Sequence, residues 1–452
     1  MNKTILLHTG PWGAEQLHKI AEGFDASAHQ RLASLYWSCD DTNLPHTFAN
    51  LLSNSHRTTN RTPEASDIVA IKRCRLLRNL SLKDAMAHWV AINQAWSQVL
   101  DNIKPIIVIS ELIDSYIIDS LKKECDKRDI PFFGLVTCFV NGYFRVTTYG
   151  EYRYTRDPSE EEVKHVTQLL TKQTYSPQFI TLSDNAFRKQ ILFRWAKNIA
   201  RVIGLSAISL VPRFRRINMV YGGLLTARKW LHMYPKLSLG QEDWKQCASV
   251  AGKPIIYVPL QHVPEATIDY WCHDVNYIDY ERTLLSLIKK YSQDFSFVIK
   301  EHPNVIGLRN PDFYNRLLNQ PGVTFSKTTT SSNDVINACD AVLVWTGSVG
   351  FEAALRGKPV LSVTSTYYMS GNHFMVLNDT TDTIEVVEFI KKISRNPITR
   401  EQQFDMVRHL LSGLVEGRLT FSKNSSAKDA CNTSPITIGA ELRKLYERWY
   451  LP

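Results

Sequence analysis

The sequence contains no run of 18 or more apolar residues, so it predicts no membrane-spanning helix. Its eight cysteines include no C-x-x-C pair, which argues against a zinc ribbon and against the disulfide framework of a secreted protein. We therefore expect reduced thiols in a cytoplasmic protein. The apolar stretch after Met1 is too short for a signal peptide and predicts a first β-strand instead.

What is present is the composition of a globular protein: 452 residues, of which 44% are hydrophobic, with a formal net charge of +9. A chain of this length exceeds one ordinary hydrophobic core, so two domains are expected. Strand-length apolar runs alternate with helical patterns over 3–150 and again over 250–420, which predicts two parallel α/β sheets. The predicted divisions are an N-terminal domain at 1–184, a basic helical linker at 185–245, a C-terminal domain at 246–425 and a closing helix at 426–452.

The segment between the two patterns carries charge of a single sign. From residue 185 to residue 240 there are eleven Lys or Arg residues and no Asp or Glu, with aromatic residues among them. Basic and aromatic residues together favour contact with an anionic membrane surface or another polyanion. Nucleic acid is disfavoured, because no nucleic-acid-binding module is recognisable. The alternative is a set of solvated helices that link the two domains.

Polar clusters follow three predicted strands of the second pattern. The strand at 255–258 leads into Gln261 to Thr267, the strand at 295–299 into Lys300-Glu301-His302-Pro303, and the strand at 341–345 into Thr346-Gly347-Ser348-Val349-Gly350. In parallel α/β sheets, ligands lie outside the carboxyl ends of the strands. The Gly-Ser turn also opens a predicted helix, whose free N–H groups favour an anion. We therefore predict a phosphate site at this edge.

In the first pattern, the strand predicted at 106–109 ends in Ser110-Glu111. A carboxylate at the carboxyl end of a strand either contacts a sugar hydroxyl of an acceptor or supplies charge to a helix N-terminus. Both readings stay open for Glu111. The glycine-containing loop at 8–13 likewise either approaches a ligand or simply turns the chain from strand to helix.

The strings L-Q-x-x-P-E-A-T, K-E-H-P and G-S-x-G-F-E-A-x-x-x-G-K-P-V are similar to those of the bacterial capsule polysaccharide biosynthesis family, which includes the capsule Kdo transferases. The resemblance covers about residues 250–365 and is weak before them. It implies a GT-B fold of class α/β, with two Rossmann-like domains and the active site in the cleft between them. It also implies a CMP-activated ulosonic or nonulosonic acid as donor substrate, with no metal and no other cofactor.

The resemblance implies roles for individual residues. His302 would contact the donor phosphate, Ser348 would hold the same phosphate, and Glu352 would contact the ribose hydroxyls. The remaining members of the predicted donor site are Lys300, Pro303, Gly347, Gly350 and Gln261. Kdo transferases of the family carry Asp-Ala-Ser where this sequence has Glu265-Ala266-Thr267. Glu265 is therefore a nucleophile, a general base or a structural contact.

Elementary chemistry points the same way. A CMP-ulosonate loses CMP as a phosphate anion from a centre with oxocarbenium character, so an enzyme must stabilise the departing charge. Lys300, His302 and Ser348 can do so without a metal, and no D-x-D motif follows a predicted strand. Glu265 is the leading candidate for the carboxylate that reacts with the anomeric centre or the acceptor hydroxyl, and Glu111 is the second.

The sequence thus predicts a glycosyltransferase of capsule or O-antigen biosynthesis, peripheral at the cytoplasmic face of the inner membrane. Its expected partners are a nucleotide-sugar donor, a glycan or glycolipid acceptor, an anionic membrane surface and other capsule biosynthesis proteins, but no nucleic acid. One alternative is a sugar-nucleotide epimerase on the same fold. The other is a non-catalytic component of capsule assembly or export.

Overall fold

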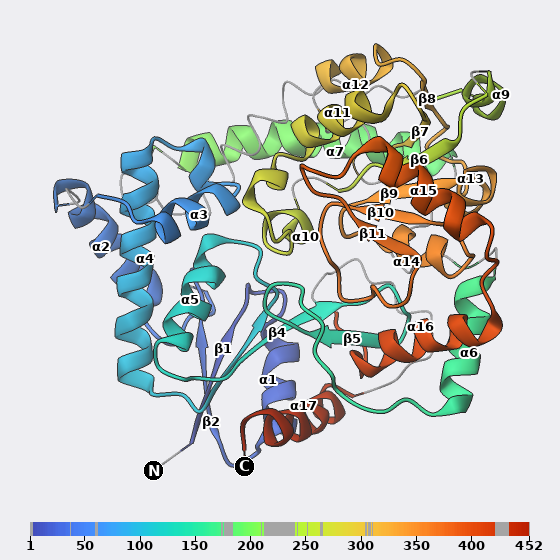
Figure 1. Ribbon diagram of the computed structural model, residues 1–452. Helices are drawn as coiled ribbons and strands as arrows, with labels where there is room; N and C mark the ends of the chain where they lie inside the picture. The colour runs from blue at the N-terminus through green and yellow to red at the C-terminus, as the bar shows by residue number, and fades with distance from the viewer. Residues whose placement is uncertain are drawn as a thin grey trace. The chain divides into compact units, whose positions relative to one another are not determined.

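The chain forms two α/β units (Figure 1). The computed structural model describes residues 3–36, 38–58, 62–172, 175, 184–208, 210–211, 240–241, 243–250, 252–262, 265–302, 305, 309, 311–420 and 434–451. Unit 1 comprises Met1–Arg156, Ile208–Gly222 and Ser412–Pro452, and unit 2 comprises Asp157–Ala207 and Gly223–Leu411.

Unit 1 is built on a six-stranded sheet in the order β12-β5-β4-β3-β1-β2. Its strands are β1 (Thr4–His8), β2 (His29–Ala33), β3 (Ile107–Glu111), β4 (Phe132–Thr137), β5 (Tyr143–Val146) and β12 (Val415–Glu416). The first four strands pair in parallel, whereas β5 and β12 are antiparallel. Leu7 pairs with both Leu32 and Ile109, and all three belong to the buried core of the unit. The strand predicted at 32–37 begins and ends earlier, as β2.

The helices of unit 1 are α1 (Ala14–Phe24), α2 (Leu44–Thr58), α3 (Ala65–Arg73), the 3-10 helix η1 (Leu77–Asn79), α4 (Leu82–Ile103), α5 (Tyr116–Asp126) and α17 (Pro435–Tyr450). The long helix α4 begins where the Ser81 hydroxyl accepts a hydrogen bond from the Asp84 N–H, a stabilising N-cap. It ends where Lys104 adopts a left-handed conformation, with φ 49°. Its buried face includes Trp96, whose indole donates to the Ile117 carbonyl at 2.9 Å.

The C-terminal segment returns to unit 1. Strand β12 pairs with β5, and α17 lies beside α1 (Figure 1). The two helices approach closely because glycine lies at the contact: a Cβ on Gly439 would lie 2.0 Å from the Ile20 carbonyl oxygen. The sequence-based division made 426–452 a separate closing helix and ended the first domain at 184. The structure differs at both places, since α17 completes the core of unit 1 and α6 (Glu160–Thr171) belongs to unit 2.

Unit 2 is built on a second six-stranded sheet, in the order β11-β10-β9-β6-β7-β8. Its strands are β6 (Ile255–Pro259), β7 (Ser296–Lys300), β8 (Val323–Phe325), β9 (Ala341–Val344), β10 (Val360–Ser362) and β11 (Phe374–Val376). All of them pair in parallel. Each of the five residues of β7 is buried, as expected for a strand covered on both faces.

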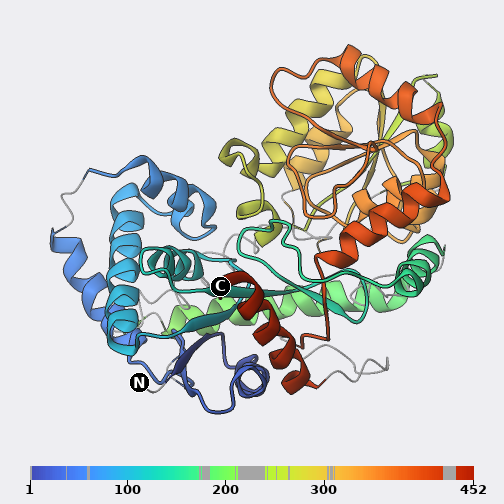
Figure 2. The same cartoon turned by 60° about the horizontal axis from the view of Figure 1, so that its bottom comes forward.

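Helices lie on both faces of this sheet (Figure 2). The helices of unit 2, besides α6, are α7 (Asp184–Ile208), α9 (Trp244–Ser249), α10 (Ala266–Asp269), the 3-10 helix η2 (Val275–Ile278), α11 (Tyr280–Tyr291), α12 (Pro311–Leu318), α13 (Ser332–Ala338), α14 (Val349–Ala354), α15 (Thr383–Ser394) and α16 (Arg400–Ser412). Leu284 and Ile288 of α11 pack in one cluster with Val258 of β6 and Ile299 of β7. Truncating either helix residue to Ala should cost about 2–5 kcal/mol.

Two Rossmann-like units in one chain confirm the predicted fold class. The predicted position of the active site in a cleft between the units stays a prediction. In the part of the chain that the structure describes, no helix is both long enough and apolar enough to cross a membrane.

Candidate functional site

The three predicted clusters leave one edge of the unit 2 sheet, because β9, β6 and β7 are neighbours in that order. Pro259 at the end of β6 pairs with Lys300 at the end of β7. The turn after β9 touches the turn after β6: a Cβ on Gly347 would lie 2.4 Å from Nε2 of Gln261. Gln261 and Lys300 are each 7% exposed. The predicted meeting of these strand ends is therefore observed.

Lys300 is a buried cation at this edge. Burial lowers its pKa from 10.5 to about 8, although Glu301 and Glu352 raise it through their charges. The ammonium group therefore stays largely protonated at pH 7. A buried positive charge that is only partly compensated is costly for the fold and attractive to an anion.

Ser348 and Glu352 form a pair one helical turn apart. The Ser348 hydroxyl donates to Oε1 of Glu352 at 3.2 Å. Burial raises the pKa of Glu352, while Arg356, the Ser348 hydroxyl and Lys300 oppose that rise. Since Glu352 is 6% exposed, its clearest role in the structure is to hold the Ser348 side chain. The expected contact of Glu352 with a ribose stays a prediction.

The glycine turn is shaped by packing. A Cβ on Gly350 would lie 2.8 Å from the hydroxyl oxygen of Tyr368 and 2.9 Å from Val344. The same Tyr368 hydroxyl donates to the Gly347 carbonyl at 2.7 Å. Helix α14 behind the turn has six residues, whereas the sequence pattern predicts a helix over 349–356. Its dipole is therefore smaller than that of the predicted helix, and the roles of Lys300 and Ser348 in binding an anion stay predictions.

Thr346 lies one residue before this turn, and sequence reasoning gave it no role. Its side chain is 6% exposed, and its Oγ1 has no hydrogen-bond partner among the described residues. Buried hydroxyls are normally paired, so an unpaired one at a strand end suits a ligand.

A buried ion pair also escaped the sequence analysis. Arg309 donates from Nε to Oε2 of Glu301 at 2.7 Å, and Tyr314 donates to the same oxygen at 2.6 Å. The other Glu301 oxygen accepts the His302 N–H at 2.6 Å, and Arg309 also donates to the Gln261 carbonyl. Arg309 thus joins the turns after β6 and β7 and fixes the backbone that presents His302. The only sequence signal was the Glu of K-E-H-P.

His302 is half-buried and faces a second histidine. Its ring and that of His262 meet edge to face, with centroids 5.7 Å apart. His262 had been recognised only as part of the Gln261–Thr267 cluster. Pro303, also predicted for the site, lies outside the described residues, as do Val263 and Pro264.

Glu265 is the residue immediately before α10. Its Oε2 accepts a hydrogen bond from the Thr267 hydroxyl at 2.8 Å, and its side chain is half-buried. These are the two residues at which the chain differs from the Asp-Ala-Ser pattern of the Kdo transferases. The longer carboxylate and the threonine hydroxyl contact each other, so the orientation of Glu265 is fixed by its own turn.

Glu111 lies in unit 1, at the end of β3. The Thr9 hydroxyl donates to its carboxylate. Burial raises the pKa of Glu111, and the contacts with Thr9, Gly10 and Trp12 oppose this rise. Nearby His8 has a pKa lowered to about 4 by burial, so its imidazole is neutral at pH 7. Glu111 therefore belongs to a separate cluster, at the strand ends of β1 and β3.

In the ranges that the structure describes, no group of three or more His, Cys, Asp or Glu side chains is arranged to hold a metal ion.

Comparison with known proteins gave one family. The family model described as "Capsule polysaccharide biosynthesis protein" matches residues 141–371. This range includes every residue of the strand-end site described above for unit 2. No curated protein matches the sequence.

Solved structures give more distant likenesses. The UDP-GlcNAc 2-epimerase from Neisseria meningitidis bound to UDP-GlcNAc is 13% identical, with 99% of each chain covered and a TM-score of 0.28. The beta Kdo 2,7 transferase of KpsC from Thermosulfurimonas dismutans is 15% identical, with 91% of this chain and 100% of that chain covered and a TM-score of 0.34. The beta Kdo 2,4 transferase of the same KpsC is 12% identical over 68% of this chain and 79% of that chain, with a TM-score of 0.34. Likenesses this distant assign neither a donor nor a reaction.

Proposed function

Because the chain belongs to the capsule polysaccharide biosynthesis protein family, we propose that it is a glycosyltransferase that uses a CMP-activated ulosonic or nonulosonic acid. The observation that carries the proposal is the buried side chain of Lys300 at the same strand-end edge as the Ser348–Glu352 pair. A buried cation destabilises the fold, but it can stabilise the negative charge that develops on a leaving phosphate. The acceptor is a glycan or glycolipid of the capsule.

In the proposed step, the acceptor hydroxyl attacks the anomeric carbon of the donor. The bond between that carbon and the CMP phosphate oxygen breaks, and its electron pair stays on the phosphate. Lys300 and the Ser348 hydroxyl stabilise the phosphate, with His302 as the third contact. Charge stabilisation of this kind needs no metal, so the proposal includes none.

A carboxylate takes part in the same step. In a single displacement, Glu265 removes the acceptor proton. In a double displacement, it attacks the anomeric carbon first and forms a sugar–enzyme ester; the acceptor hydroxyl then displaces the carboxylate, which takes the acceptor proton. The hydrogen bond from Thr267 orients its Oε2 for either role. If Glu265 has neither role, Glu111 is the next candidate.

We also propose that the protein works at the cytoplasmic face of the inner membrane, held by its basic segment. Helix α7 carries an exposed apolar stripe in which residues recur every three or four positions: Phe193, Ala196, Ala200, Ile203 and Ala207. Phe193 and Ile203 are 69% and 66% exposed, and the exposed cations Lys197 and Arg201 lie on the same helix. An apolar stripe beside cations suits the surface of an anionic bilayer. The residues at 212–239 lie outside those described.

The donor assignment is tested by thermal unfolding with CMP and UMP at one shared concentration, about one hundred times the dissociation constant of CMP. Binding at that excess stabilises the native state by about 2.7 kcal/mol. We expect CMP to raise the Tm of the wild type by several degrees, UMP to raise it less, and Ser348→Ala to reduce the CMP effect. A shift with UMP but not with CMP would favour a uridine-nucleotide enzyme, such as the epimerase alternative, and would overturn the donor assignment.

A further inference from the structure

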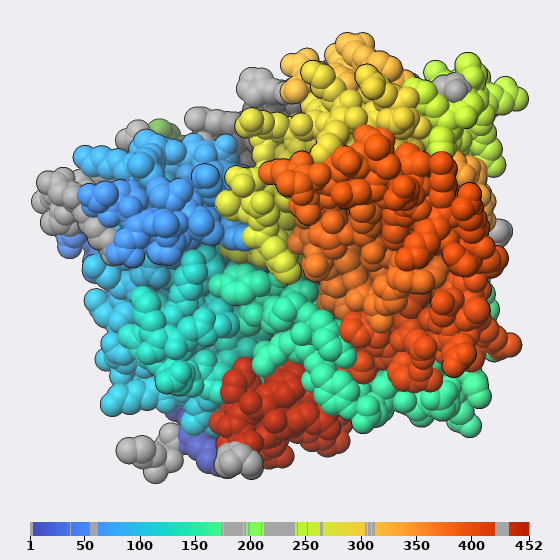
Figure 3. Space-filling model, in the orientation of Figure 1, coloured from blue at the N-terminus to red at the C-terminus, as the bar shows by residue number. Residues whose placement is uncertain are grey.

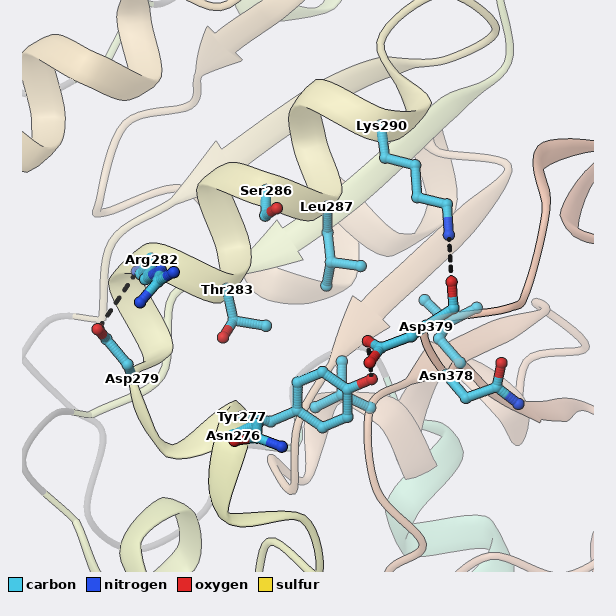
Figure 4. Close-up of a pocket in the computed structure, with 12 residues that line it drawn as sticks. Asn276, Tyr277, Asp279, Arg282, Thr283, Ser286, Leu287, Lys290, Asn378 and Asp379 are labelled. Carbon is cyan, nitrogen blue, oxygen red and sulfur yellow. Dashed lines mark hydrogen bonds between the residues drawn. The ribbon is translucent and has the colours of Figure 1, made fainter. Parts of the chain in front are cut away.

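Unit 2 has a separate cavity of about 490 Å³ beside helix α11 (Figure 4). Its walls come from η2 and α11 and from the chain that follows β10 and β11. In the space-filling view, the yellow atoms of the part of the chain that contains η2 and α11 adjoin the orange atoms of the part that contains β10 and β11 (Figure 3). None of the residues predicted for the strand-end site lines this cavity. It is large enough for a small ligand, since such pockets usually span about 300–1,000 Å³.

The centre of the cavity is organised by Tyr277 and Asp379. The Tyr277 hydroxyl donates to Oδ1 of Asp379 at 2.8 Å, and the Lys290 ammonium donates to the Asp379 carbonyl at 3.2 Å. The two segments are therefore tied together although they lie far apart in the sequence. Tyr277 is half-buried, and its ring forms a rigid wall (Figure 4).

Two exposed cations flank this wall. Arg282 and Lys290 both line the cavity from α11, and eight positions on a helix correspond to roughly 12 Å along its axis. Asp279 and Asp379 also line the cavity, so its formal charge is balanced. A polyphosphate carries its negative charges on adjacent groups and needs clustered cations, whereas the two cations here are spread along the helix.

The rest of the lining is mixed. Leu287, Val363 and Leu377 supply apolar surface, and Val363 and Leu377 are 4% and 2% exposed. Thr283, Ser286 and two asparagines supply hydroxyl and amide groups. A lipid chain would leave these polar groups unpaired, which is unfavourable. A sugar chain offers both hydroxyl groups and apolar C–H faces. If its sugars are acidic, their carboxylates can also pair with Arg282 and Lys290.

We propose that this cavity binds an acidic oligosaccharide, at a glycan site separate from the strand-end site. The inference rests on the proposed function in one respect, that an acidic glycan is present where the protein works. Trp345 connects the two places: it donates from its indole to the Tyr277 carbonyl at 3.2 Å, and Thr346 is the next residue. A glycan held here would remain at high effective concentration near the strand-end site of the same unit.

The test is direct binding of two tetrasaccharides of equal length, the acidic tetragalacturonate and the neutral maltotetraose, measured by titration calorimetry. We expect the wild type to bind tetragalacturonate more tightly, with an affinity that falls as salt rises. The double variant R282Q/K290Q should bind it at least tenfold more weakly, and Tyr277→Phe should weaken binding less. The matched control is Lys289→Gln, an exposed cation of the same helix that does not line the cavity, and it should bind like the wild type.

Failure of this inference can be told apart from failure of the proposed function. The CMP-dependent rise in Tm should be the same in R282Q/K290Q and in the wild type, which also shows that the variant folds. The inference is overturned if the wild type binds neither tetrasaccharide, or if the double variant binds tetragalacturonate as tightly as the wild type. Tetragalacturonate binding without any response to CMP would leave the glycan site standing and refute the donor assignment.

Discussion

Replacement of Lys300 by methionine should make the protein more stable and less able to bind its ligand. Lys300 is 7% exposed, and its pKa falls from 10.5 to about 8. At 1.36 kcal/mol per pKa unit, holding this ammonium protonated in the fold at pH 7 costs roughly 3 kcal/mol. Methionine has a similar shape and no charge. We expect Lys300→Met to raise the free energy of unfolding by about 1–3 kcal/mol. The lower value applies if buried Glu352 is destabilised by the loss of the nearby Lys300 charge.

The stability difference between Lys300→Met and the wild type should depend on pH. Between pH 8 and pH 10.5 the unfolded chain binds a proton at Lys300 that the folded chain does not, so wild-type stability rises with pH in that window. The advantage of Lys300→Met should therefore be complete below pH 8 and shrink towards zero near pH 10.5. Urea unfolding at pH 7 and pH 9.5 measures both values, and the exposed Lys289→Met is the control, with an expected change within about 0.5 kcal/mol.

The same variant should lose most of the CMP-dependent rise in Tm at pH 7. If Lys300→Met is less stable than the wild type at both pH values, the ammonium is not held at a cost and the reasoning fails. If the variant is more stable but still responds fully to CMP, Lys300 is not a phosphate contact.

Three further predictions concern the remaining site residues and the membrane. Glu265→Gln should lower the transfer rate by roughly two or more orders of magnitude with nearly unchanged CMP affinity. A sugar adduct on residue 265 in mass spectrometry of a slowed variant would identify a nucleophile, and retained activity would move the role to Glu111. His302→Ala and Ser348→Ala should each weaken CMP binding or turnover without changing the far-ultraviolet circular dichroism, and wild-type turnover in both would refute the site. Residues 185–240 should bind anionic vesicles in a co-sedimentation assay and be released by salt, and salt-insensitive or absent binding would support the linker reading.

Strands β6, β7 and β9 could be predicted because each contains an apolar run of strand length, whereas β11, with only three residues, was not predicted. The sequence pattern predicts a helix over 280–291 and a strand over 323–325, which are the bounds of α11 and β8. Local periodicity and flanking polar residues determine both elements. The position of Gln261, Lys300 and Gly347 at one edge of the sheet could also be predicted, because ligands bind outside the carboxyl ends of parallel strands.

What escaped prediction depends on contacts between distant residues. The partner of Glu301 is Arg309, in a stretch without periodicity, and only the folded chain brings them within 2.7 Å. The return of the C-terminal segment to unit 1 depends on β12, a two-residue strand that leaves no pattern in the sequence. Local propensity cannot report such pairings.

The central claim is tested most directly by mixing the purified protein with CMP-Kdo and other CMP-activated ulosonic acids in the presence of capsule glycolipid acceptors, and measuring released CMP and acceptor mass together. The account predicts that one donor releases CMP in step with a gain of one sugar mass on the acceptor, and that Ser348→Ala and Lys300→Met slow both. No CMP release from any of these donors, together with conversion of a UDP-sugar to its epimer, would contradict it.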